Sequence, residues 1–218
     1  MRNLLKQNQI FLIAYLIILI AGLIPVMMYP RTDLHLFLNQ FHAPYADLFF
    51  KYVTFLGSGI TAFILCLILI FIRIRYSIVM FASWTGAGIV VQLLKHLIFP
   101  GFDRPVKVFE TISGLHLVQG IEFHDHFSFP SGHAATALAI FGLLAMITTR
   151  KWLKMVFLLC AVIVSYSRVY LSQHFLEDIL LGSAIGILAV IIFYWYFHHL
   201  KMSRTDHPVQ YYFRKEKQ

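Results

Sequence analysis

His174 and Asp178, two side chains able to share a proton, stand four residues apart in the last quarter of this sequence. Positions four apart lie on one helix face, so the pair can meet if a helix there extends back to His174. A carboxylate bonded to one ring nitrogen fixes the tautomer and raises the basicity of the other nitrogen, which makes a histidine nucleophilic. The spacing therefore predicts either a nucleophilic histidine or an ordinary His–Asp pair at a helix start.

Three side chains that are positively charged at neutral pH could join this pair in one site. One of them lies close to the pair in the sequence, and the other two lie in earlier segments that the fold could bring near it. Arg168 follows Ser167 and precedes the His–Asp pair, which favours a buried phosphate partner over an isolated membrane anchor. Arg104 can hold two phosphate oxygens at once, and the following proline stiffens the backbone that presents it. Lys95 ends a long apolar stretch, so its side chain either joins this site or reaches the lipid headgroups.

The segment Pro130-Ser131-Gly132-His133 precedes an apolar stretch and predicts the start of a helix. Free backbone N–H groups and the positive end of the helix dipole would make that start an anion site. The plainer interpretation is an ordinary N-cap formed by Ser131. His133 favours the anion site, because it adds a proton donor at the edge of the anion.

A fourth polar group, His124-Asp125-His126, lies between these segments and could indicate a metal site. It offers no closed set of ligands, so a solvated loop or a contact with a substrate headgroup is the favoured interpretation. We therefore predict no metal and no cofactor.

The elements that must hold these residues are predicted to be membrane helices. Of the 218 residues, 59% are hydrophobic and 13% charged, and the mean hydropathy of +0.74 is far above that of soluble domains. Six apolar stretches are long enough to cross a hydrocarbon core of about 30 Å. They are 9–28, 52–72, 76–95, 133–149, 152–171 and 177–197. The predicted fold is all-α, a six-transmembrane-helix bundle of one domain, 1–218, with a long 96–132 loop between the third and fourth helices.

The Lys and Arg residues predict how this bundle is oriented. They collect on one side if the N-terminus is cytoplasmic, which places both termini and a basic tail of about 201–218 inside. The 96–132 loop then faces outward. So do the three clusters of candidate residues, which are Lys95 to Pro105, Pro130 to His133 and Ser167 to Asp178. Because topology and anionic lipids explain the net charge of +8, nucleic acid is not an expected partner. Cys66 and Cys160 fall inside predicted spans and imply no disulfide.

Together, these segments resemble the motifs of the type-2 phosphatidic acid phosphatase (PAP2) family, which read K-x6-R-P, P-S-G-H and S-R-x5-H-x3-D. The second matches at Pro130 to His133, and the third matches from Ser167 to Asp178. The first departs from the pattern, because eight residues separate Lys95 from Arg104. A loop around Pro100-Gly101 could absorb the two extra residues.

This resemblance implies a role for each matched residue. His174 would attack phosphorus and form a phosphohistidine, Asp178 would orient it, and His133 would protonate the leaving oxygen. The residues that would hold the phosphoryl oxygens are Lys95, Arg104, Ser131, Gly132 and Arg168. Water would then release phosphate, with three cations and a helix start in place of a metal.

Several alternatives remain at this stage. The same intermediate could transfer phosphate to a second lipid, and a non-enzymatic carrier would need an inverted repeat that the sequence lacks. The vanadium-dependent haloperoxidases share the anion-holding motifs, but the apolar spans favour a lipid substrate. Undecaprenyl diphosphate is the favoured substrate, ahead of phosphatidylglycerophosphate, phosphatidic acid and lipid A. The expected location is a bacterial-type cytoplasmic membrane, and no oligomeric state is inferred.

Overall fold

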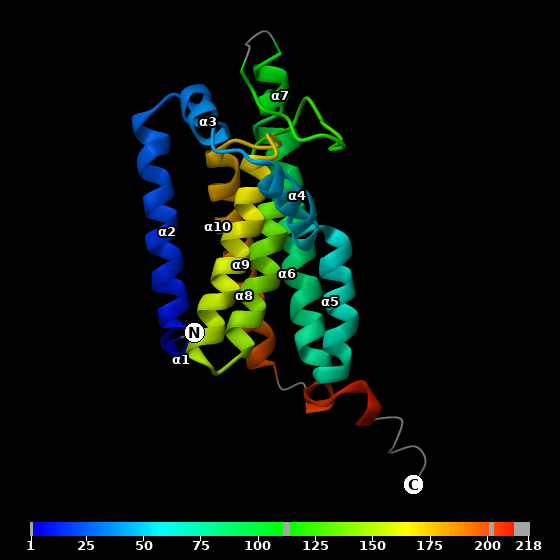
Figure 1. Cartoon of the computed structure of the whole chain (residues 1–218). Helices are drawn as coiled ribbons and strands as arrows, with labels where there is room; N and C mark the ends of the chain where they lie inside the picture. Colours follow the sequence, from blue (N-terminus) through cyan, green and yellow to red (C-terminus); the bar gives the residue numbers. More distant parts are fainter. Residues whose placement is uncertain (1, 111–113, 201–202, 212–218) are drawn as a thin grey trace.

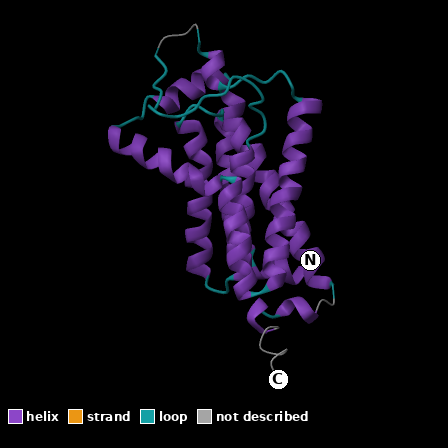
Figure 2. Cartoon of the chain, turned by 90° about the vertical axis from the view of Figure 1, so that its right-hand side faces the viewer, coloured by secondary structure: helices purple, strands orange, loops and turns teal. Residues whose placement is uncertain are grey.

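The computed structural model describes residues 2–110, 114–200 and 203–211, and within these ranges it contains helices and no strand (Figure 1; Figure 2). The predicted all-α class is therefore confirmed. The α-helices are α1 (Arg2–Gln7), α2 (Gln9–Met28), α3 (Arg31–Asn39), α4 (Pro44–Val53), α5 (Gly59–Ile72), α6 (Ile74–Leu93), α7 (Pro105–Val108), α8 (Gly132–Ile147), α9 (Lys151–Tyr170) and α10 (Leu176–His199). Shorter turns of other helix types are Thr54–Gly57, Leu94–Ile98 and Ser203–Asp206. The structure describes residues 203–211 of the predicted basic tail, and the rest of that tail lies outside the described residues.

Among the described residues, four helices are long and apolar enough to cross a membrane, and a bent pair supplies a fifth span if it is counted as one. The four are Gln9–Met28, Ile74–Ile98, Lys151–Tyr170 and Leu176–His199. The pair joins Pro44–Gly57 to Gly59–Ile72 with a bend of 55°. The prediction of several membrane helices is confirmed, but the count of six is not.

The second predicted span, 52–72, is wrong as a single straight helix. Helix α5 starts anew after Ser58, whose Oγ accepts a hydrogen bond from the N–H of Thr61. Gly57 and Gly59 flank this serine. Glycine disfavours helix interiors and serine satisfies a free N–H at a helix start, so the local sequence ends one helix and begins another inside an apolar stretch.

Helix α8 is shorter than the predicted 133–149 span, since it ends at Ile147 and covers 16 residues. At 1.5 Å per residue this is about 24 Å, less than the thickness of the hydrocarbon core. Most of its side chains are buried, because α6, α9 and α10 pack around it. Helix α8 is therefore surrounded mainly by protein.

Two glycines let the backbone of α10 approach α8 closely. A Cβ at Gly182 would lie 2.3 Å from the carbonyl oxygen of Ser131, and one at Gly186 would lie 2.2 Å from that of Ala135. The N–H of Ser131 also donates to the carbonyl of Asp178 at 2.9 Å. These small residues bring the start of α8 against the first turn of α10, and so join two of the three predicted clusters.

The short helices α3 and α7 lie at one end of the bundle, whereas α1 lies at the other (Figure 1). The connection between α6 and α8 crosses the α3 end, above the point where α9 turns into α10 (Figure 1). Large exposed hydrophobic side chains cover α2 and α5, as helices that face lipid require. The predicted site therefore forms where the loop-rich end meets the membrane helices.

Candidate active site

His174 lies in the connection between α9 and α10 and is buried, with 2% exposure. Its Nδ1 is 3.1 Å from Oδ2 of Asp178. The two side chains meet without a helix that extends back to His174, because α10 begins at Leu176. The pair forms instead around the helix N-terminus, where Phe175 is the N-cap and its N–H donates to the same carboxylate oxygen at 2.9 Å.

Ser128 belongs to this site, although the sequence pattern did not indicate it. Its hydroxyl donates to Oδ2 of Asp178, and its Oγ lies 3.4 Å from Nδ1 of His174. The only available signal was its position two residues before Pro130, in the segment of the predicted anion site. Because Nδ1 of His174 faces Asp178 and Ser128, Nε2 is the ring nitrogen left for a substrate.

Replacing Ser128 with alanine should lower kcat by roughly 10- to 100-fold, a usual loss when a group that orients a functional side chain is removed. KM should change little, since this serine contacts the carboxylate and not the phosphate site. The matched control is Ser165→Ala, which removes a buried hydroxyl bonded to the carbonyl of Ala161 within α9 and should keep full activity. Phosphate release from a lipid phosphate in detergent measures both variants, and equal rates would refute the role of Ser128.

The three predicted cations converge on His174. Burial lowers the pKa of His174 well below 6.5, and three positive charges lower it further, those of Arg104, Arg168 and Lys95. Burial also lowers the pKa of Arg104. Lys95 and Arg168 are almost fully buried, with 7% and 8% exposure. His133, on the first turn of α8, lies in the field of the same cations.

Gln173 links Arg104 and Arg168 by accepting a hydrogen bond from each. Its Oε1 accepts hydrogen bonds from Nη1 of Arg104 at 3.1 Å and from Nη2 of Arg168 at 3.4 Å. Arg168 also donates from Nη1 to Oγ1 of Thr54 at 2.9 Å, a partner that no sequence signal indicated. Its Nε has no hydrogen-bond partner among the described residues. A buried N–H group without a partner lowers the stability of the fold. An anion that enters the site would accept its hydrogen bond and remove this cost.

The eight-residue spacing between Lys95 and Arg104 does not separate these two cations. A π-helical turn, Leu94–Ile98, follows α6 and turns Lys95 inward, whereas Leu97 is 74% exposed. Such turns are frequent at functional sites. Lys95 and Arg104 line one open pocket of about 520 Å³, which we call the polar pocket. Its other lining residues are Gln92, His96, Phe123, His124, Asp125, His126 and Phe127.

Ser131 and Gly132 form the start of α8. Ser131 is the N-cap, and its Oγ accepts a hydrogen bond from the N–H of Ala134 at 3.4 Å. The plainer interpretation of the Ser131 side chain is therefore correct. It is compatible with an anion site, because the backbone N–H groups of the first turn remain the natural donors for one.

The His124-Asp125-His126 segment forms one wall of the polar pocket. Nδ1 of His126 lies 2.6 Å from Oδ1 of Asp103, and both side chains are partly exposed. Within the described ranges, no group of three or more His, Cys, Asp or Glu side chains could hold a metal ion. This segment lies beside Lys95 and Arg104 in the pocket.

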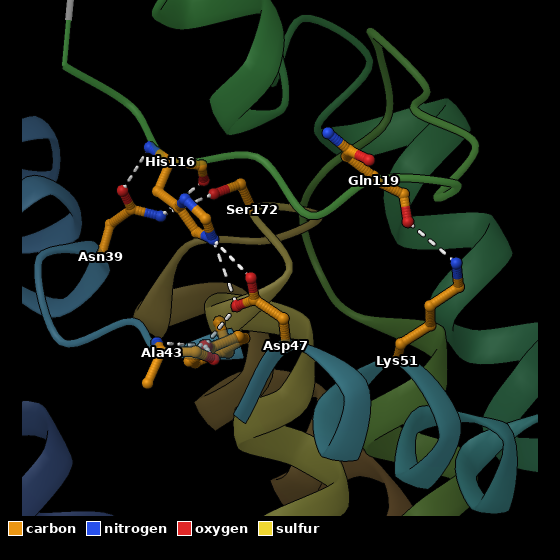
Figure 3. Close-up of polar contacts among 8 residues, drawn as sticks. Asn39, Ala43, Asp47, Lys51, His116, Gln119 and Ser172 are labelled. Atoms are coloured by element: carbon orange, nitrogen blue, oxygen red, sulfur yellow. Dashed lines mark hydrogen bonds and ion pairs between the residues drawn. The ribbon is translucent and has the colours of Figure 1, made fainter. Parts of the chain in front are cut away.

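A set of polar contacts, here called the outer clasp, ties the loop to the turn that carries His174 (Figure 3). Its members are Asn39, Asp47, His116, Tyr170 and Ser172. Asn39 accepts from the N–H of His116 at 2.7 Å and donates to its carbonyl at 2.9 Å and to Oγ of Ser172 at 3.3 Å. Asp47 lies 3.0 Å from Nε2 of His116 and accepts from the hydroxyl of Tyr170 at 2.5 Å. Ser172, two residues before His174, has a φ of 51°, so these bonds help to hold a strained turn.

Replacing Asn39 with alanine should lower kcat by about 10- to 100-fold, since it frees both the loop and the turn and small displacements of reacting groups are costly. It should also lower the free energy of unfolding by about 1–3 kcal/mol, because partners in the outer clasp lose their hydrogen bonds. The control is Lys51→Met, which removes a bond to the carbonyl of Gln119 that holds the loop but not the turn. Steady-state kinetics and thermal unfolding are measured for both variants. If Lys51→Met loses as much activity as Asn39→Ala, the link between the loop and the turn does not contribute to activity.

Comparison with known proteins identifies the family of this chain. The model of the PAP2 superfamily matches residues 76–202, which is more than half of the sequence. The chain belongs to the PAP2 superfamily. The resemblance drawn from the three motifs is confirmed, and the matched region contains all eight predicted site residues of this PAP2 protein.

Individual relatives of this PAP2 protein carry different names. Lipid A 4'-phosphatase of Bacteroides thetaiotaomicron is 27% identical over 187 residues, which cover 82% of each chain. Undecaprenyl-diphosphatase of Sulfolobus acidocaldarius is 40% identical over 70 residues, which cover 30% of this chain and 34% of the relative. The crystal structure of Aquifex aeolicus LpxE superimposes with a TM-score of 0.67 and 28% identity, over 75% of this chain and 94% of LpxE.

Proposed function

We propose that this protein removes a phosphate from a membrane lipid, with His174 as the nucleophile. The observation that carries the proposal is a buried histidine whose Nδ1 faces Asp178 and on which three cations converge. Phosphoryl transfer depends mainly on positioning and on neutralising oxygen charge, which this arrangement provides. The apolar helices and the lipid-directed names of the relatives support a lipid substrate.

In the first step, Nε2 of His174 attacks phosphorus and forms an N–P bond while the bond to the lipid oxygen breaks. The lowered pKa keeps His174 unprotonated at neutral pH, so its lone pair is free to attack. Asp178 orients the ring and stabilises the positive charge that develops on it. His133 donates a proton to the departing oxygen, and the negative charge of the bound phosphate offsets the nearby cations and favours the protonated form of His133.

In the second step, His133 takes a proton from water, which attacks the phosphohistidine. The N–P bond breaks, inorganic phosphate leaves and His174 is restored. The groups that hold the phosphoryl oxygens in both steps are Lys95, Arg104, Arg168, the hydroxyl of Ser131 and the backbone N–H of Gly132, since the N–H of Ser131 donates to the carbonyl of Asp178. No step uses a metal, so activity should persist in EDTA.

For the substrate, the polar pocket favours a lipid with a large polar headgroup, such as the phosphorylated sugars of lipid A. About 520 Å³ beside Lys95 and Arg104 leaves room for sugar as well as phosphate. The relative named lipid A 4'-phosphatase also aligns over most of both chains. Undecaprenyl diphosphate is the second candidate, favoured by the short alignment with the undecaprenyl-diphosphatase. We place the site on the outer face of a bacterial-type cytoplasmic membrane, with both termini inside.

Lipid donors labelled with radioactive phosphate test this proposal. The panel is lipid A, undecaprenyl diphosphate, phosphatidylglycerophosphate and phosphatidic acid, each in detergent with EDTA. Free phosphate is expected, with the highest kcat/KM for lipid A, and the denatured enzyme should retain an acid-labile label on histidine. Label on a second lipid would identify a phosphotransferase instead, and no release from any lipid would refute the proposal.

A further inference from the structure

An apolar groove lies directly beside the polar pocket, along one face of α6 and the π turn. Its volume is about 620 Å³, and its lining includes Trp84, Gly88, Ile89, Leu93 and Leu97. From the first to the last of these residues the helix rises about 20 Å, at 1.5 Å per residue. The groove therefore starts next to the candidate site and extends far along a helix that is long enough to cross the membrane.

Gly88 creates the open part of this groove. A Cβ built at Gly88 would meet no atom within 4 Å. Trp84, one turn earlier, leans towards α5, since a Cβ at Gly59 would lie only 3.0 Å from its Cζ2. Ile89 and Leu93 are 60% and 51% exposed. The groove is thus apolar, is not filled by side chains and is open on the outer face of the helix bundle.

Gln92 and His96 line both the groove and the polar pocket, so the two are continuous. The ring of His96 also packs against Phe127 of the loop, with 4.5 Å between ring centroids. On one side of this junction stand Lys95 and Arg104, and on the other side the lining is apolar. The site thus presents cations first, then polar side chains and then an apolar surface. A lipid phosphate needs this order, because its phosphate is followed by a polar linker and then by hydrocarbon.

We infer that the groove on α6 binds a hydrocarbon chain of the lipid whose phosphate reaches His174. Gln92 and His96 then contact the polar linker between the phosphate and the chain. The inference rests on the proposed function and extends it, because it gives the substrate a route from the bilayer into the polar pocket along α6. Substrate selection then depends on the chain as well as on the headgroup.

Filling the groove at Gly88 tests this inference. The probes are two phosphatidic acids in mixed micelles, one with long dioleoyl chains and one with short, water-soluble dihexanoyl chains. In Gly88→Trp, the ratio of kcat/KM for the long-chain over the short-chain probe is expected to fall at least about tenfold, since lost apolar contact penalises only the long chain. The control is Ala21→Trp at an exposed position of α2, which should leave this ratio within about twofold of that of the native chain.

An unchanged ratio in Gly88→Trp would overturn the groove assignment, and so would an equal loss with both probes. If Gly88→Trp does not fold, Gly88→Leu fills the groove with a better helix former and is judged by the same ratio. A native chain that releases phosphate from neither probe and from no lipid of the panel above would instead count against the proposed function. If only another lipid of that panel is hydrolysed, its long-chain and short-chain forms replace the two probes and the same ratio is measured. The two failures are therefore distinguishable.

Fluorescence gives a second readout that does not depend on turnover. In a His174→Ala chain that keeps Trp84 but carries Trp152→Phe and Trp195→Phe, the remaining tryptophan reports on the groove. Phosphatidic acid with brominated chains should quench it more strongly than brominated phosphatidylcholine at the same low mole fraction. Equal quenching by the two lipids would mean that the groove contacts bulk lipid only, which would also overturn the assignment.

Discussion

Replacing His174 with alanine is expected to lower kcat for phosphate release by at least about 10⁴-fold, in detergent with EDTA present. The loss is large because the nitrogen that bonds to phosphorus is removed, and water in its place would lack the orientation that Asp178 provides. The matched control is His198→Ala, at an exposed position near the end of α10, which should retain full activity. Phosphate release is measured with each purified variant and compared with that of the native chain.

Chemical rescue separates a nucleophile from a structural histidine. In His174→Gly, added imidazole should restore part of the phosphate release, since the small molecule supplies the missing ring nitrogen. A histidine that only supports the fold would show no such recovery, and its loss would lower the thermal unfolding temperature in step with activity. Full activity in His174→Ala would remove the basis of the proposed mechanism.

Replacing Arg168 with lysine is expected to lower kcat by about 10²- to 10³-fold, the usual effect of removing one donor to a developing oxyanion. The charge is kept, but the planar fork that reaches both Thr54 and Gln173 is lost, together with the buried Nε that has no partner among the described residues. Because this arginine is 8% exposed, a lysine there cannot exchange its lost bonds for water.

The control for Arg168→Lys is Arg150→Lys, an exposed exchange at the N-cap of the same helix. It should leave kcat within about twofold of that of the native chain, as surface exchanges usually do. Both variants are compared by steady-state kinetics and by thermal unfolding. If Arg168→Lys keeps more than about a third of the native kcat at an unchanged unfolding temperature, the bidentate role of this arginine is wrong.

The amino-acid sequence was sufficient to identify the family and the all-α class, and it predicted eight residues of the candidate site. These conclusions follow from short-range information: runs of apolar residues predict membrane helices, and motif residues such as His174 and Asp178 stand at fixed spacings within one segment. The tertiary structure left all eight predicted residues at one end of the bundle. Even with the lengthened spacing, Lys95 and Arg104 line one pocket.

Only the tertiary structure decided which distant segments complete the site. Ser128 reaches Asp178 because Gly182 lets α10 approach the start of α8, a contact between segments about fifty residues apart that no local spacing encodes. The same applies to Thr54, which meets Arg168 across more than a hundred residues. Packing between helices, rather than the pattern along any one of them, decided how His174 is held.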